Sequence, residues 1–228
     1  MTSMKYAMLA AVASTGLLFS AVGAAQTTVV TFDNGGEGWD GNGLIEDTGG
    51  NPGANGHFLL ESFGIEFRTD SNPAFIGDLT HDSSITIGLD VLVNSITFKG
   101  TEVSRNQIVE FRSHALADGK PYTSVWYNLG VLQAGAAWNN FAVTFVPASE
   151  ELPAGWGGYG AEGPNGEPIL PEGVTFADVM ATVDEVAFTT FEPGWFYGPT
   201  VFDVRIDNLR IERSAPSDVV FADGFDTP

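Results

Sequence analysis

The sequence has no cysteine and few basic residues, and each shortage excludes a class of function. Without cysteine, the 228-residue chain can form no disulfide, no thiolate metal site and no cysteine nucleophile. Nine Lys and Arg against 29 Asp and Glu give a formal net charge of -20. Such a charge repels the phosphates of nucleic acids and of anionic lipid surfaces. The sequence therefore predicts no nucleic-acid partner.

Long apolar runs are also scarce, and the one clear example lies at the N-terminus. Lys5 precedes the apolar run 7–22, and small residues follow at 23–25, which is the order of a secretory signal peptide. The alternative is an N-terminal membrane anchor, but Ser14 and Gly16 interrupt the run and it falls short of the roughly 20 apolar residues of a span. We therefore expect cleavage after Ala25.

The division of the chain follows from this cleavage position. We expect a signal peptide at 1–25, one β domain at 26–213 and a loosely docked C-terminal tail at 214–228. No later segment predicts a membrane span, so the mature protein is expected to be secreted, in the periplasm or outside the cell. A hydrophobic share of 43% and an aromatic share of 12% supply a core and argue against disorder.

Alternation with a period of two dominates the mature chain and predicts an all-β fold. About ten strands are expected, separated by Gly, Asn, Asp and Pro: 27–32, 57–61, 65–69, 84–93, 95–99, 108–112, 122–129, 141–145, 185–191 and 201–212. This spacing is typical of an antiparallel jelly-roll β-sandwich. One short helix is expected at 176–183, with Thr175 as its N-cap. The Pro- and Gly-rich segment 147–173 predicts an excursion from the sandwich that contributes no central strand.

The apolar phase of the last predicted strand changes within the strand. Phe202, Val204 and Ile206 share one phase, whereas Leu209 and Ile211 share the other. A β-bulge near Asp207 and Asn208 would turn both halves of the strand toward the core. It would also direct the Asp207 carboxylate away from its place in the strand ladder. The alternative is a strand that is buried on both faces or ends early.

Several short motifs occur in a characteristic order along the chain: Thr31-Phe32-Asp33, Glu37-Gly38-Trp39, the loop 49–53, the stretch 75–79 with 85–90, and finally 183–186 with 206–209. In this order they resemble bacterial secreted domains related to laminin IV and to galactose-binding-like carbohydrate-binding modules. The resemblance covers roughly residues 27 to 213. It implies a jelly-roll β-sandwich, usually non-catalytic, that binds carbohydrate or extracellular matrix.

Three oxygen-bearing residues are candidate ligands of a structural calcium ion. Asp33 ends the first strand, Asn51 lies in the Gly-rich loop, and Asp207 lies at the expected bulge. Ca²⁺ takes six to eight oxygen ligands from such groups, and related carbohydrate-binding modules often carry calcium at equivalent edges. The alternative is that the two carboxylates only accept backbone hydrogen bonds in turns.

Aromatic residues in two predicted loops are candidates for ligand binding. Trp156 and Tyr159 lie in the excursion, whereas Trp195 and Tyr197 lie in a second loop between two prolines. Rings in loops can form a platform for the apolar face of a sugar. The alternative is that both loops fold back and cover an open end of the sandwich.

Catalysis has weaker support in the sequence. The three histidines are scattered, so no zinc trio and no Ser–His pair emerges. Arg112 and His114 share a strand face near Tyr122 and are similar to the polar groove of jelly-roll polysaccharide lyases, although the accompanying lyase motifs are missing. The sequence thus predicts an exported, non-catalytic module that binds carbohydrate or matrix polymer. A surface-interaction protein without a small ligand and a polysaccharide lyase are the alternatives.

Overall fold

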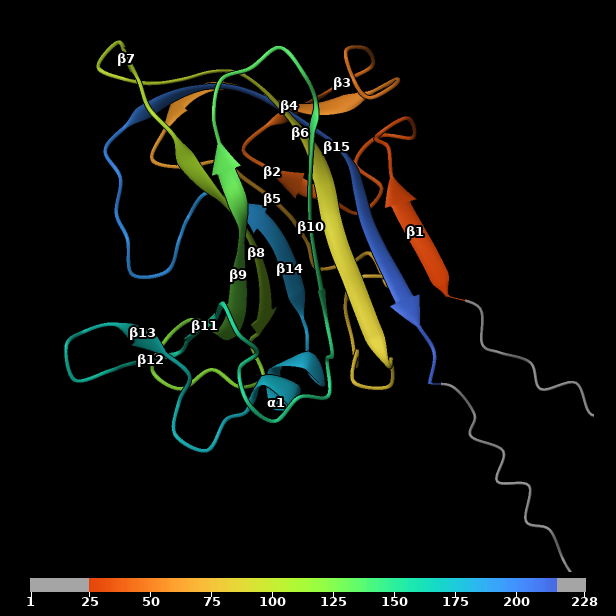
Figure 1. Cartoon of the computed structure of the whole chain (residues 1–228), viewed down its shortest axis with the longest axis vertical. Helices are drawn as coiled ribbons and strands as arrows, with labels where there is room; N and C mark the ends of the chain where they lie inside the picture. Colours follow the sequence, from red (N-terminus) through yellow and green to blue (C-terminus); the bar gives the residue numbers. More distant parts are fainter. Residues whose placement is uncertain (1–24, 217–228) are drawn as a thin grey trace, which may run out of the picture.

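The computed structural model describes residues 25–216, which form an antiparallel β-sandwich of two sheets (Figure 1). The predicted signal peptide, except Ala25, and the tail beyond Pro216 lie outside the described residues. The first strand begins at Gln26, directly after the predicted cleavage position. Within residues 25–216, no helix is long and apolar enough to cross a membrane.

Sheet A has the central order β10-β6-β15-β4-β3, and β1 also pairs with β15 while β7 pairs with β6. All of these pairs are antiparallel. The strands are β1 (Gln26–Val30), β3 (Leu44–Glu46), β4 (Asn55–Ser62), β6 (Ser84–Phe98), β7 (Thr101–Glu102), β10 (Asn139–Phe145) and β15 (Thr200–Ser214).

Sheet B has the order β11-β9-β8-β14-β5-β2, again with antiparallel pairing. Its strands are β2 (Asp40–Gly41), β5 (Glu66–Thr69), β8 (Arg105–Ser113), β9 (Thr123–Leu132), β11 (Trp156–Tyr159) and β14 (Glu185–Thr189). A small hairpin joins β12 (Ala161–Glu162) to β13 (Pro168–Ile169), and one short helix, α1 (Phe176–Met180), follows it. The predicted all-β sandwich with one short helix is confirmed.

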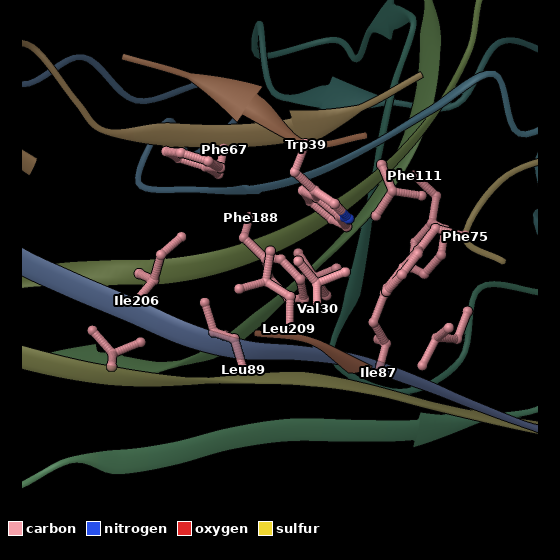
Figure 2. Packing of buried hydrophobic residues seen from close by; sticks show 14 of the residues in the cluster. Val30, Trp39, Phe67, Phe75, Ile87, Leu89, Phe111, Phe188, Ile206 and Leu209 are labelled. Carbon is pink, nitrogen blue, oxygen red and sulfur yellow. The ribbon is translucent and has the colours of Figure 1, made fainter. Parts of the chain in front are cut away.

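The core lies between the two sheets because each strand turns alternate apolar residues inward. Sheet A contributes residues such as Ile87 and Leu209, and sheet B contributes residues such as Phe111 and Phe188, all buried (Figure 2). Trp39, from the loop before β2, stacks on Phe188 with ring centroids 5.5 Å apart. Trp39 is therefore part of the sandwich core.

The predicted β-bulge is present in β15. Ile206 and Leu209 are both buried, and the register between β15 and β6 shifts between Asp207 and Arg210. Asn208 takes a positive φ of 50°, which returns the following residues to the inner phase. The bulge leaves Asp207 fully buried and directed at the Gly-rich loop instead of into a regular ladder.

The helix begins where the sequence predicts and ends earlier. Thr175 and Asp178 form a capping box, each side chain bonding the other's backbone N–H. The helix ends at Met180 because Val183 joins a β-bridge with Gly77, whose N–H donates to the Val183 carbonyl at 2.8 Å. The predicted end at Val183 is therefore three residues too late.

Candidate functional site

The outer face of sheet B carries a polar network that alternation in β8 places away from the core. Val109 and Phe111 point inward, so Glu110 and Arg112 point outward. The pairing of β8 with β14 sets Arg112 opposite Glu185. Although they point away from sheet A, Glu110 is only 1% exposed and Arg112 only 5%.

Arg112 donates hydrogen bonds to three carboxylates. Its Nε donates to Glu110 Oε2 at 2.8 Å, its Nη1 to Glu185 Oε1 at 2.5 Å and its Nη2 to Glu66 Oε2 at 2.8 Å. Ser124 Oγ donates to the second oxygen of Glu110 at 2.5 Å. Burial raises the pKa of Glu110 and acts against the charge of Arg112, but the carboxylates of Glu110 and Glu66 still raise the pKa of Arg112. We call Glu66, Glu110, Arg112 and Glu185 the arginine cluster.

Arg68 lies beside the arginine cluster but is bonded much less tightly. Its nearest carboxylate oxygens belong to Glu185 at 3.5 Å, Glu66 at 3.6 Å and Asp40 at 3.7 Å. Among the described residues none of these contacts has hydrogen-bond geometry, so the guanidinium is surrounded by charge without using its N–H donors. The side chain is 49% exposed and lines a cavity of about 390 Å³. The cavity lining comprises Asp40, Gly41, Asn42, Glu66, Arg68 and Phe191.

Four exposed aromatic rings occur in the segments that precede β5 and follow β14, and we call them the aromatic rim: Phe63, Phe191, Trp195 and Phe196. Phe191 lines the cavity, and its ring lies against Gly64. Phe63 contacts Phe196 with ring centroids 5.3 Å apart. Trp195 and Phe196 are 69% and 81% exposed, which is unusual for large rings unless they meet a partner.

The loop 191–199 that carries most of the rim is fixed at both ends. Asn106 Nδ2 donates to Glu192 Oε2 at 2.7 Å, and the Tyr197 ring lies over the Arg105 guanidinium at 4.3 Å. At its tip, Gly194 lies against Pro168 of β13. Figure 1 shows this loop (blue) and the β12–β13 hairpin (teal) projecting on the same side of the molecule, away from β1 and β15.

The four predicted ligand-binding aromatics do not form one platform. Trp195 is an exposed loop ring, as expected, whereas Tyr197 anchors its loop on Arg105. Tyr159 contacts Tyr122 with centroids 5.3 Å apart, at the edge of the arginine cluster. For Trp156 the structure corrects the expectation of a loop surface.

Trp156 belongs to edge strand β11 and is only 9% exposed. It packs against Phe111, Phe145 and Phe176, with the closest centroid at 4.8 Å. A ring surrounded in this way contributes to the core and presents no flat face to a ligand. For this residue, the alternative in which the excursion covers the sandwich describes the structure.

The predicted metal ligands Asp33, Asn51 and Asp207 meet at the loop 49–53, together with Asp90. Asp33 Oδ1 accepts from the Ala54 N–H at 3.0 Å, and Asn51 Nδ2 donates to Asp90 Oδ2 at 3.0 Å. The Asn51 N–H also donates to Asp207. We call Asp33, Asn51, Asp90 and Asp207 the loop cluster.

Close approach requires glycine in this loop. A Cβ on Gly50 would lie 2.8 Å from Asp207 Oδ2, and one on Gly53 would lie 2.5 Å from Asp33 Oδ1. Both glycines therefore let the backbone reach the carboxylates. The side chains of Asp33 and Asp207 are brought to the same loop although 174 residues separate them in sequence (207 minus 33).

The charge of the loop cluster is poorly balanced around Asp207. This carboxylate is 0% exposed, and its hydrogen-bond donors are the backbone N–H groups of Asn51 and Asn208. Burial raises its pKa, and the charges of Asp90 and Asp33 raise it further. Among residues 25–216, no group of three or more His, Asp or Glu side chains is already arranged around a common metal position. Asp33 and Asp207 nevertheless supply the charge and the ligand type that a divalent cation takes, because each of their carboxylate oxygens keeps a lone pair beyond the one hydrogen bond that it accepts. Each oxygen of Asp90 already accepts two hydrogen bonds.

Sequence reasoning missed most of the arginine cluster and the cavity. Alternation in β8 does indicate that Glu110 and Arg112 share a face. The approach of Glu66 and Glu185 depends on the pairing order β8-β14-β5, for which the sequence holds no local signal. His114 was expected on the Arg112 face, and its ring does contact Tyr122 at 5.8 Å beyond the end of the strand.

Comparisons with known proteins give no family assignment. No protein-family model matches, and no curated protein matches. Among solved structures, an exo-β-agarase superposes with a TM-score of 0.46 and 12% identity, over 83% of this chain and 26% of that one. The adhesin domain of Lys-gingipain from Porphyromonas gingivalis W83 superposes with a TM-score of 0.34 and 14% identity, over 85% of this chain and 99% of that one. The chain thus spans about a quarter of the agarase, and similarity at this level carries no argument about function.

Proposed function

We propose that the chain is an exported, non-catalytic module that binds carbohydrate on the outer face of sheet B. The observation that supports this most directly is the cavity that Phe191, a ring of the aromatic rim, shares with Glu66 and with Arg68, whose hydrogen-bonding groups are open. Its natural partner is a polysaccharide of the cell surroundings or of an extracellular matrix. The signal peptide and the resemblance to laminin IV-like domains are part of the same proposal.

A sugar suits both halves of this surface. The C–H faces of a pyranose pack on aromatic rings, and its hydroxyls both donate and accept hydrogen bonds. The arginine cluster holds Glu66 and Glu185 in place before any ligand arrives, which lowers the entropy lost on binding.

Binding is better supported than polysaccharide lyase activity. A lyase base must take a proton from the substrate, but burial and the nearby Glu110 charge raise the pKa of Tyr122. Arg112, which in a lyase would neutralise a uronate, already donates to three carboxylates. The alternative of a surface-interaction protein without a small ligand leaves the open groups of Arg68 without a role.

Substitutions in the aromatic rim test the proposal, because its exposed rings contribute little to the stability of the fold. Trp195→Ala and Phe196→Ala should weaken retention on the recognised polysaccharide at least about tenfold, as expected for loss of a stacked ring worth about 1.5 kcal/mol. The melting temperature should stay unchanged, since both rings are exposed. Leu44→Ala is the matched control, because Leu44 is 75% exposed on the opposite sheet. Full retention by both rim variants would refute the proposed surface.

We also propose that the loop cluster binds Ca²⁺ as a structural ion. Asp33, Asp207 and Asn51, with Asp90 beside them, would hold it. When bound, the ion supplies the positive charge that Asp207 lacks and ties the first and last strands of the domain together.

A further inference from the structure

We infer that the cavity beside β2 and β5 binds an uncharged sugar residue, so that the ligand is a neutral polysaccharide. The inference rests on the proposed carbohydrate-binding function and names the class of glycan and its subsite. At about 390 Å³ the cavity falls in the size range of small-ligand sites.

Arg68 supplies the hydrogen-bond donors of this subsite. Arg112 donates to three carboxylates at 2.5 to 2.8 Å, whereas every carboxylate oxygen near Arg68 lies at 3.5 Å or more. A guanidinium has five N–H donors, and those of Arg68 face a half-open cavity. A hydroxyl that enters the cavity can accept from them without breaking an existing bond.

Glu66, which lines the cavity, supplies an acceptor, and Glu185 lies beside Arg68 outside the lining. Each has one oxygen bonded to Arg112 and the other oxygen on the Arg68 side, Oε1 of Glu66 and Oε2 of Glu185. Alternating acceptors and donors at fixed positions match neighbouring hydroxyls on a sugar ring. Asn42 does not take part, because its amide bonds the Gly64 carbonyl and the Glu66 N–H.

Phe191 supplies the apolar wall. It is 42% exposed, and its ring rests on the backbone of Gly64, where a Cβ would come within 2.7 Å of it. The ring is therefore held at the edge of the cavity, next to the polar groups and continuous with the aromatic rim. The aromatic wall suits the C–H face of a sugar ring, and the polar groups suit its hydroxyls.

The charges around the cavity select against charged ligands of either sign. Four carboxylates, those of Asp40, Glu66, Glu110 and Glu185, surround two guanidinium groups. A uronate or sulfate ester would meet this excess of negative charge. An amino sugar would instead place its cation against Arg68, the group that faces the cavity. A neutral hydroxyl-rich ring meets neither penalty.

Electrophoresis of the whole domain through native gels that contain dissolved polysaccharide tests the inference. The probes are neutral polymers (agarose, xylan and mixed-linkage β-glucan), polyanions (alginate and polygalacturonate) and a polycation (chitosan oligosaccharide). We expect retardation by a neutral polymer, insensitive to salt, and a loss of affinity of about tenfold or more in Arg68→Met and in Phe191→Ala. Lys99→Met is the control, because Lys99 lies in the β6–β7 turn and is not part of the cavity lining.

The outcomes separate the two proposals. Retardation by alginate or polygalacturonate that salt abolishes would overturn the neutral-ligand inference and leave carbohydrate binding intact. Retardation by chitosan alone, unchanged or strengthened in Arg68→Met, would overturn it in favour of a cationic ligand. Neutral-polymer binding that survives both substitutions would place the subsite elsewhere. Binding to none of the polymers, with all variants folded by circular dichroism, would overturn the proposed function itself.

Discussion

The arginine cluster on sheet B and the loop cluster beside β15 both gather three carboxylates, but they balance this charge differently. In the arginine cluster Arg112 bonds all three acids directly. In the loop cluster Asp207 has only backbone N–H donors, and Arg210 approaches Asp90 at 3.5 Å. The comparison teaches that the first cluster is complete without an added ion, whereas the second has charge and oxygen ligands to accept one.

Removing the arginine should give the largest effect. Arg112→Met removes the guanidinium that bonds three carboxylates and leaves the fully buried Glu110 without its charged partner, so we expect a loss of about 3–5 kcal/mol in the free energy of unfolding, measured with urea. Lys120→Met is the control, because its ion pair with Glu162 at 2.6 Å is exposed to solvent and should contribute little to stability. Equal losses in both variants would show that burial does not distinguish the two ion pairs.

Calcium should have the next largest effect, and only through the loop cluster. Relative to EDTA, calcium at a hundredfold excess over its dissociation constant should stabilise the domain by about 2.7 kcal/mol, measured as a rise in melting temperature. Asp207→Asn should abolish the rise. Asp82→Asn should keep it, because Asp82 pairs with Arg213 outside the cluster. A melting temperature that responds to neither EDTA nor calcium would leave the buried charge of Asp207 unbalanced and end the metal proposal.

The smallest effect should come from a third polar group, on the outer face of sheet A. His57 lies between Glu46 and Asp203, with 2.9 Å from each ring nitrogen to a carboxylate oxygen. The hydrogen bond from His57 lowers the pKa of Glu46, and bonds from Asn94 and His57 lower that of Asp203 although burial acts to raise it.

These lowered pKa values fix the direction of the pH effect. The stabilisation is present above the ordinary values of 4.5 and 3.8 and is lost as the pH falls through the lowered folded-state values. Glu46→Gln should therefore be less stable than the wild type at pH 7, and the difference in urea midpoint should shrink as the pH falls below 4.5. A difference that stays constant as the pH falls would mean that packing of Glu46, rather than its charge, stabilises the sheet.

The sequence predicted the architecture well because strands leave a local signal. The phase change after Ile206 located the bulge, and the capping residues located α1. The two predicted strands 84–93 and 95–99 are one strand, β6. The register of β6 against β15 shifts between Asp203 and Val204, and this shift accommodates the polar residue between the two predicted strands.

The candidate site was harder to predict because its parts meet only through long-range pairing. Trp156 has two glycines after it, so the segment has no alternation to indicate its inward face, and its ring neighbours come from β8, β10 and α1. Arg68 and Phe191 lie 123 residues apart (191 minus 68) and share a cavity only after β5 pairs with β14. Three of the four members of the loop cluster were predicted, all except Asp90, because loop and bulge residues carry recognisable turn chemistry.

The position of β15 determines when the sandwich can assemble. Thr200–Ser214 is the last strand in the described chain, yet it lies between β6 and β4 and also pairs with β1. A growing chain that ends before residue 200 therefore has no partner for β1 and no connection between β6 and β4. Sheet A is therefore complete only after almost the whole domain has left the ribosome. Until then β1, β4 and β6 lack the one strand that pairs with all three.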